Sequence, residues 1–198
     1  MSGGHGAVEG SNKKIALLIA VLALFLAFAE TLAKSAQTNA LSDNVEASNL
    51  WAFFQAKTIR MTVVRTAGEN AELQRAAAGE AAADLYRKRI EDWSKTAARW
   101  DSEPETGEGR KELAARAKHA EEKRDLALAR YHSYELGSAA FQVGIVLASA
   151  MVITGIAALA WAGAALGLIG AGLLGIGLFA PLAFHELEHW WHGLLLLH

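Results

Sequence analysis

The chain has 198 residues, of which 53% are hydrophobic, and its formal net charge is −2. Apart from Lys13 and Lys14, every Lys and Arg falls within residues 34–138, where Asp and Glu are equally numerous. This balance excludes the net basic face that nucleic-acid binding requires. The chain contains no Cys, which excludes disulfides, thiolate chemistry and cysteine metal sites.

Residues 1–14 are rich in Gly and Ser, and we expect them to form a flexible tail. The apolar run that follows, residues 15–33, spans about 28 Å as a helix, close to the thickness of the hydrocarbon layer. Ala27-Phe28-Ala29 resembles the small-x-small site at which a secretory signal is cleaved. Glu30 and Lys34, in the order that stabilises a helix, favour a retained transmembrane helix instead. Both interpretations place the next segment on the same side of the membrane.

Residues 34–68 are predicted to contain a polar linker followed by an amphipathic helix rich in aromatic residues. Asp43 and Glu46 match an N-cap and its capping-box partner, and apolar residues then recur at three- and four-residue spacing. Trp51 and Phe54 belong to these recurring apolar residues, and two alternatives account for them. They anchor the helix at the membrane interface, or they pack against the helices that follow.

A coiled-coil helical hairpin is predicted over residues 69–138. Heptad patterns on either side flank residues 101–109, where Pro104, Gly107 and Gly109 indicate a turn. The seam of this hairpin is rich in alanine, so it buries little apolar surface per residue. We therefore expect it to need further partners, among them copies of itself.

Residues 141–184 contain no Lys, Arg, Asp, Glu or His, and this length is about twice the roughly 20 residues that cross a bilayer. We predict transmembrane helices at 139–160 and 164–184, joined at Trp161-Ala162-Gly163, with Trp161 anchored at the interface. The expected fold is an all-α integral membrane protein with three transmembrane helices and an extramembrane antiparallel helical hairpin. Because no charged residue lies within these spans, a proton relay is unsupported.

Small residues recur every four and every seven positions along the last predicted span. Such residues let transmembrane backbones approach closely, which promotes helix association in lipid. The partner is the preceding span or another copy of the chain. The predicted packing residues are Gly163, Gly167, Gly170, Ala171, Gly175 and Gly177, with Gly144 and Ala148 on the preceding span.

The final segment, residues 185–198, contains the pattern His-Glu-x-x-His. On a helix the two His share a face and can bind one Zn²⁺, but the scaffold of a metalloprotease does not follow. A Zn or Cu site without proteolysis is one alternative. The other is an interfacial tail anchored by Trp190 and Trp191. The candidate metal ligands are His132, His185, Glu186, Glu188, His189 and His192.

Two parts of the chain resemble a known family. They are Asn49 to Ile59, with its Trp-x-x-x-Gln-Ala-Lys element, and Tyr131 to Glu135 together with Phe141 to Ser149. They resemble the bacterial family known as domain of unknown function 4337, over roughly residues 13–183. The resemblance implies an N-terminal span, a charged helical segment and a paired C-terminal span, and no reaction. In that family the turn between the last two spans usually carries Arg or Lys, which Trp161-Ala162-Gly163 lacks.

No pattern in the sequence compels a reaction. We expect a non-enzymatic membrane protein that acts as a self-associating scaffold or as an accessory subunit of a larger membrane complex. A metal-binding protein that uses the C-terminal His and Glu residues is the alternative. Lys13 and Lys14 flank the first span, which favours a cytoplasmic N-terminus. The hairpin and the C-terminus are then periplasmic, in a bacterial inner membrane.

Overall fold

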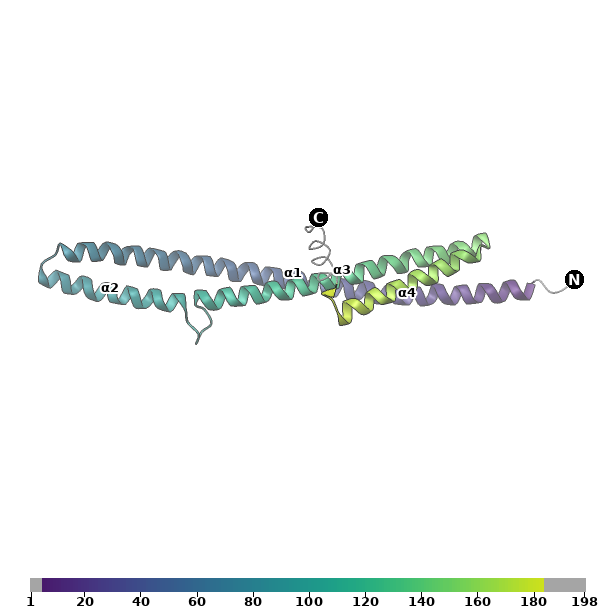
Figure 1. The fold of residues 1–198 in the computed structure, drawn as a ribbon, viewed down its shortest axis with the longest axis horizontal. Helices are drawn as coiled ribbons and strands as arrows, with labels where there is room; N and C mark the ends of the chain where they lie inside the picture. Colours follow the sequence, from purple (N-terminus) through teal and green to yellow (C-terminus); the bar gives the residue numbers. More distant parts are fainter. Residues whose placement is uncertain (1–4, 184–198) are drawn as a thin grey trace, which may run out of the picture. The chain divides into compact units, whose positions relative to one another are not determined.

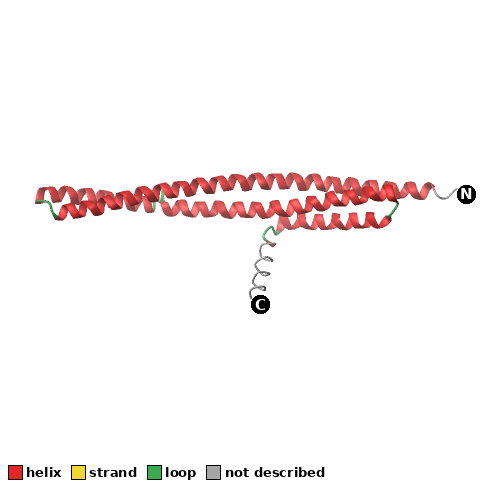
Figure 2. Cartoon of the chain, turned by 90° about the horizontal axis from the view of Figure 1, so that it is seen from above, coloured by secondary structure: helices red, strands yellow, loops and turns green. Residues whose placement is uncertain are grey.

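The computed structural model describes residues 5–183, with side chains from Lys13 onward, and its regular elements are four helices. They are α1 (His5–Ala76), α2 (Glu80–Asp101), α3 (Arg110–Thr154) and α4 (Ala157–Phe179) (Figures 1 and 2). Three of them contain stretches long and apolar enough to cross a membrane, namely Lys13–Ala76, Arg110–Thr154 and Ala157–Phe179. The predicted all-α fold is confirmed.

The chain divides into two compact units. The first, here called the apolar unit, comprises residues 1–41 and 124–198, and the second, the charged unit, comprises residues 42–123. Helices α1 and α3 each contribute to both units, because the division falls within them.

Helix α1 carries a seven-residue repeat of buried and half-buried positions, which we call the first seam. The spacing alternates between four and three, as in the contact face of a coiled coil. Small or apolar residues such as Ala36 and Ala40 continue the first seam through the polar stretch that was predicted to be a linker, so α1 runs without a break. The seam consists of Ile15, Ile19, Leu22, Leu26, Ala29, Ala33, Ala36, Ala40, Asp43, Ala47, Leu50, Phe54, Lys57, Met61, Val64, Gly68, Ala71 and Arg75.

The core of the apolar unit lies where α1, α3 and α4 meet. Phe141 of α3 is 1% exposed, and its ring stacks on Phe25 of α1 at a centroid distance of 5.8 Å. Leu22 of α1, Tyr134 of α3 and Leu174 of α4 belong to the same buried cluster. Burying these large side chains between helices provides the close packing that holds apolar helices together in lipid.

The turn between the last two apolar helices lies at Gly155 and Ile156, so the predicted turn at residues 161–163 is wrong. Gly155 has a φ of +72°, which an L side chain rarely adopts, and glycine is therefore suited to this reversal. The Oγ1 atom of Thr154 accepts a hydrogen bond from the Ile156 amide at 3.3 Å. Trp161 lies inside α4 and is 78% exposed.

The charged unit also differs from the predicted hairpin of residues 69–138. Its chain reversal falls at residues 77–79, and both α2 and α3 pack against α1 rather than against each other (Figure 2). Helices α2 and α3 together form a second layer over α1, and residues 102–109 connect them as a loop that interrupts this layer. A heptad pattern shows which face of a helix is buried but not which helix covers it, and for this reason the predicted pairing of the two hairpin helices is wrong.

Candidate functional site

The first candidate site is the contact between α3 and α4, where backbones approach too closely for side chains. A Cβ atom on Gly163 would lie 2.7 Å from the carbonyl oxygen of Gly144 and 3.5 Å from the Cβ of Ala148. A Cβ on Gly170 would lie 3.0 Å from the carbonyl oxygen of Gly137. The predicted packing residues Gly144, Ala148 and Gly163 therefore meet within one chain, and Gly170 meets Gly137, which was not among the predicted residues.

The other small residues of α4 face different surroundings. A Cβ on Gly167 would lie 2.5 Å from Cδ2 of Leu22 in α1, and one on Gly177 would lie 2.5 Å from Cε1 of Tyr134 in α3. A Cβ on Gly175 would meet no atom within 4 Å, and Ala171 is exposed. Helix α4 thus uses its small residues against two neighbours and leaves part of this set open.

A polar contact joins α1 and α3 near one end of their apolar stretches. Nε2 of Gln142 donates a hydrogen bond to Oε1 of Glu30 at 3.3 Å, and its distance to Oγ of Ser138 is 3.5 Å. The sequence alone paired Glu30 with Lys34, one turn further along the same helix. The contact with Gln142 instead fixes the axial position of α1 relative to α3.

The second candidate site lies in the charged unit around Lys57, a residue of the first seam. Its side chain is 9% exposed, with Nζ 3.8 Å from Oε2 of Glu103 and 3.9 Å from Oε2 of Glu108. Nζ also lies 5.6 Å from the centroid of the Phe53 ring. Because α2 ends at Asp101 and α3 begins at Arg110, this part of the seam faces the acidic loop.

Sequence reasoning missed this site, although a signal was present. Lys57 stands seven residues after Leu50 and seven before Val64, at a position where the repeat calls for an apolar residue. A positive charge on a buried seam needs a partner of opposite charge. The glutamates of segment 102–109 were the candidate partners in the sequence.

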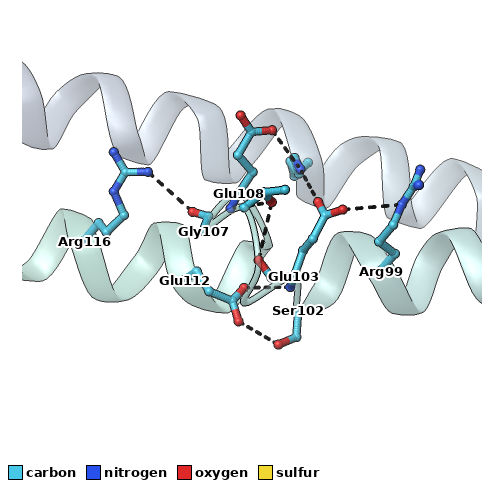
Figure 3. Close-up of polar contacts among 9 residues, drawn as sticks. Arg99, Ser102, Glu103, Gly107, Glu108, Glu112 and Arg116 are labelled. Atoms are coloured by element: carbon cyan, nitrogen blue, oxygen red, sulfur yellow. Dashed lines mark hydrogen bonds and ion pairs between the residues drawn. The ribbon is translucent and has the colours of Figure 1, made fainter.

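Glu112 closes the loop by accepting two hydrogen bonds. They come from Oγ of Ser102 at 2.6 Å and from the backbone amide of Glu103 at 3.1 Å (Figure 3). The Ser102 hydroxyl and then the Glu103 amide stabilise the charged carboxylate, so the pKa of Glu112 is lowered. On the other side of the loop, Nη1 of Arg116 lies 3.4 Å from the carbonyl oxygen of Gly107.

Asp101 links the end of α2 to the start of α3. Its carboxylate lies 2.9 Å from Nζ of Lys111 and 2.8 Å from Nη2 of Arg110. These hydrogen bonds, with that to Lys111 the strongest influence, lower the pKa of Asp101. The guanidinium of Arg110 also lies over the ring of Phe54, 5.7 Å from its centroid, and so ties the loop to α1.

The predicted interface anchors Trp51 and Phe54 lie within the charged unit. Nε1 of Trp51 donates a hydrogen bond to Oε1 of Glu121 at 2.9 Å, and its ring meets that of Phe54 edge to face at 5.4 Å. Both pack against a buried cluster that includes Leu113 and Ala117. The structure therefore favours the packing alternative over the membrane-interface alternative for these two residues.

Of the candidate metal ligands, only His132 is described, and it is exposed on α3. Within the described part of the chain, no three His, Cys, Asp or Glu residues come together as a metal site would require. Metal binding stays a prediction, because most of its residues, as well as the predicted anchors Trp190 and Trp191, lie outside the described residues. They are His185, Glu186, Glu188, His189 and His192.

Both sites are built from helix contacts and ion pairs, in an all-helical chain with three helices long and apolar enough to cross a membrane. Such features are typical of membrane proteins whose helices associate. Residues 11–180 match the family model described as a domain of unknown function (DUF4337), and the chain belongs to that family. The resemblance noted from the sequence is confirmed. No curated protein and no solved structure matches the chain.

Proposed function

We propose that this protein is a non-enzymatic membrane scaffold that self-associates or serves as an accessory subunit of a larger membrane complex. The observation that carries this proposal is the exposure of large apolar side chains on the charged unit. Ile59, Val63 and Leu73 of α1 are 65%, 62% and 73% exposed, and Leu85 of α2 is 74% exposed. A helix face that is solvated by water normally carries polar residues there, so these side chains favour a protein partner.

Membrane insertion is the second part of the proposal. The apolar parts of α1, α3 and α4 would lie in lipid, where the exposed Leu168, Ile169 and Phe179 of α4 contact acyl chains. Lys13 and Lys14 precede the first apolar stretch and support a cytoplasmic N-terminus. The charged unit and the C-terminus would then lie in the periplasm, and the membrane would be a bacterial inner membrane.

Topology is tested with a compartment-sensitive reporter placed in the loop at Gly107 or after His198. Both reporters are expected on the non-cytoplasmic side. Reporters on opposite sides would refute three spans, whereas two cytoplasmic reporters would refute only the orientation.

Association is tested by crosslinking the full chain in native membranes and measuring the mass of the products. A mass that is a multiple of the chain supports self-association, and a larger species containing other subunits supports the accessory role. A strictly monomeric, partner-free species would overturn the proposal.

A further inference from the structure

We propose that α1 pairs in parallel with α1 of a second copy of this chain, through a second heptad seam on its exposed face. This inference rests on the proposed self-association and names the surface and the partner. Its starting point is the outer face of α1 within the charged unit, which lies opposite the first seam.

The second seam is defined by its spacing and its lack of charge. From Val45 to Leu73, the spacing between consecutive seam residues alternates between four and three, as in a coiled-coil contact face. None of these positions carries a charge, and all are exposed except Ala56, which is half-buried. The second seam consists of Val45, Asn49, Ala52, Ala56, Ile59, Val63, Thr66, Asn70 and Leu73.

The same spacing continues toward the N-terminus in the apolar part of α1. Leu17, Val21, Leu24 and Phe28 occupy the corresponding positions and are 66%, 41%, 57% and 57% exposed. Between them and Val45, the repeat falls on uncharged Ser and Thr residues: Thr31, Ser35, Thr38 and Ser42.

The absence of charge from this face is not a general property of the charged unit. Residues 42–76 of α1 carry several ionisable side chains, and each one falls outside the second seam. Helix α2 likewise places exposed charges, including Asp84, Arg87 and Lys95, on its outer surface. The charged residues of α1 in this stretch are Asp43, Glu46, Lys57, Arg60, Arg65, Glu69, Glu72 and Arg75.

The period and length of the second seam identify its partner. A helix that pairs along this whole stretch must present an uncharged face with the same seven-residue repeat. Helix α1 of a second copy presents that face over an equal length. Two copies inserted in one membrane with the same orientation also have α1 running in the same direction, so their pairing is parallel.

Two asparagines support a parallel pair in register. Asn49 and Asn70 occupy equivalent positions of the repeat. Each stands four residues after one seam residue and three before the next, which is the a position of a heptad. An Asn at such a position fixes register and favours two strands, because an unmatched amide would be left against apolar side chains. In a parallel pair each of these residues meets its own equivalent in the other copy.

The residues that flank the second seam are compatible with this alignment. In a parallel pair, side chains five residues apart face each other across the seam edge. These pairs are Ser48 with Phe53, Gln55 with Arg60, Thr62 with Ala67, and Glu69 with Gln74, and none joins like charges. The alignment is therefore free of the repulsion that separates mismatched coiled coils.

Because the chain has no Cys, single-cysteine crosslinking tests the contact directly. Ile59→Cys and Val63→Cys are expected to give disulfide dimers upon oxidation in native membranes, since a disulfide joins Cα atoms about 4.4–6.8 Å apart. Arg65→Cys, exposed on the same helix but outside the second seam, is the matched control and is expected to stay monomeric on a non-reducing gel. Equal crosslinking of Arg65→Cys and Val63→Cys would overturn the proposal.

Charge insertion provides an independent measurement. The double variant Ile59→Lys and Val63→Lys places like charges opposite each other, and the dimer dissociation constant in detergent is expected to rise by about tenfold or more. Ala81→Lys adds a charge at an exposed position of α2 that belongs to neither seam and should leave the constant within about twofold. Helical circular dichroism confirms that both variants are folded.

These outcomes separate this inference from the proposed function. A wild-type chain that is oligomeric by mass, with an unchanged constant in the double variant, would refute the α1 surface and leave self-association standing. A wild-type chain that is strictly monomeric would refute both.

Discussion

Replacing Gly163 with alanine tests whether glycine is required where α3 and α4 cross. The added Cβ would lie 2.7 Å from the carbonyl oxygen of Gly144, and this atom belongs to the backbone of a helix. Neither helix can relieve the overlap by rotating a side chain, so α4 must move away from α3. We expect the Gly163→Ala variant to be destabilised.

The size of the effect follows from a comparison with a matched glycine. Gly175 lies on the same helix, and a Cβ there would meet no atom within 4 Å. Both substitutions raise the intrinsic helix preference by up to about 1 kcal/mol, so this gain cancels when the two variants are compared. The remaining difference is the overpacking at Gly163, for which about 1–3 kcal/mol is typical.

The assay is unfolding of the purified protein in mixed micelles, in which the fraction of sodium dodecyl sulfate is raised while helical circular dichroism is followed. Gly163→Ala is expected to unfold at a lower detergent fraction than both wild type and Gly175→Ala. If the two variants unfold together, the close approach of α3 and α4 does not contribute to stability and the reasoning is refuted.

Three further predictions concern the turn and the loop. Gly155→Ala forces an L side chain into a φ of +72° and should lower the free energy of unfolding by about 1–2 kcal/mol in the same assay, with an unchanged midpoint contradicting the turn. Lys57→Met removes the ion pairs to Glu103 and Glu108, so a glutamate-specific protease should cut the loop faster, while the unfolding free energy changes by no more than about 1 kcal/mol. The pKa of Glu112 is lowered in the folded state, so its contribution to stability is present above the unfolded pKa, near 4.3, and is lost as the pH falls through the lower folded value. Protection of the loop from an acid-tolerant protease should therefore decline below about pH 4 in wild type, and Glu112→Gln should show a flatter profile.

The position of Lys57 explains how the charged unit accommodates a break in its second layer. On either side of Lys57, the first-seam residues between 47 and 54 and between 61 and 71 are apolar or small, with Leu50 and Val64 among them. Where the loop replaces a helix, the seam holds a lysine whose ammonium reaches the acidic side chains of that loop. A buried charge is tolerated only when it is paired, and here the loop supplies the pairing.

Hydropathy and residue spacing are sufficient to predict the helical class and the number of apolar helices. Long uncharged runs have one stable solution in lipid, because the backbone must satisfy its own hydrogen bonds. The spacing of Gly163 and Gly170 likewise identified the face of the last helix that packs, since small residues at helical intervals permit close approach. Each of these features is a property of one helix, so the sequence of that helix is enough to predict it.

Which helices meet, and where the chain turns, becomes clear only from the contacts between helices. The heptads of α2 and α3 are equally compatible with pairing to each other or to α1. For α3, the buried cluster that contains Leu50 together with Leu113 and Ala117 resolves the choice. The sequence does not predict the turn at Gly155, because a positive φ depends on the path of the chain and not on composition. Helix pairing depends on two surfaces that fit each other, so the repeat of one helix does not identify the helix that it contacts.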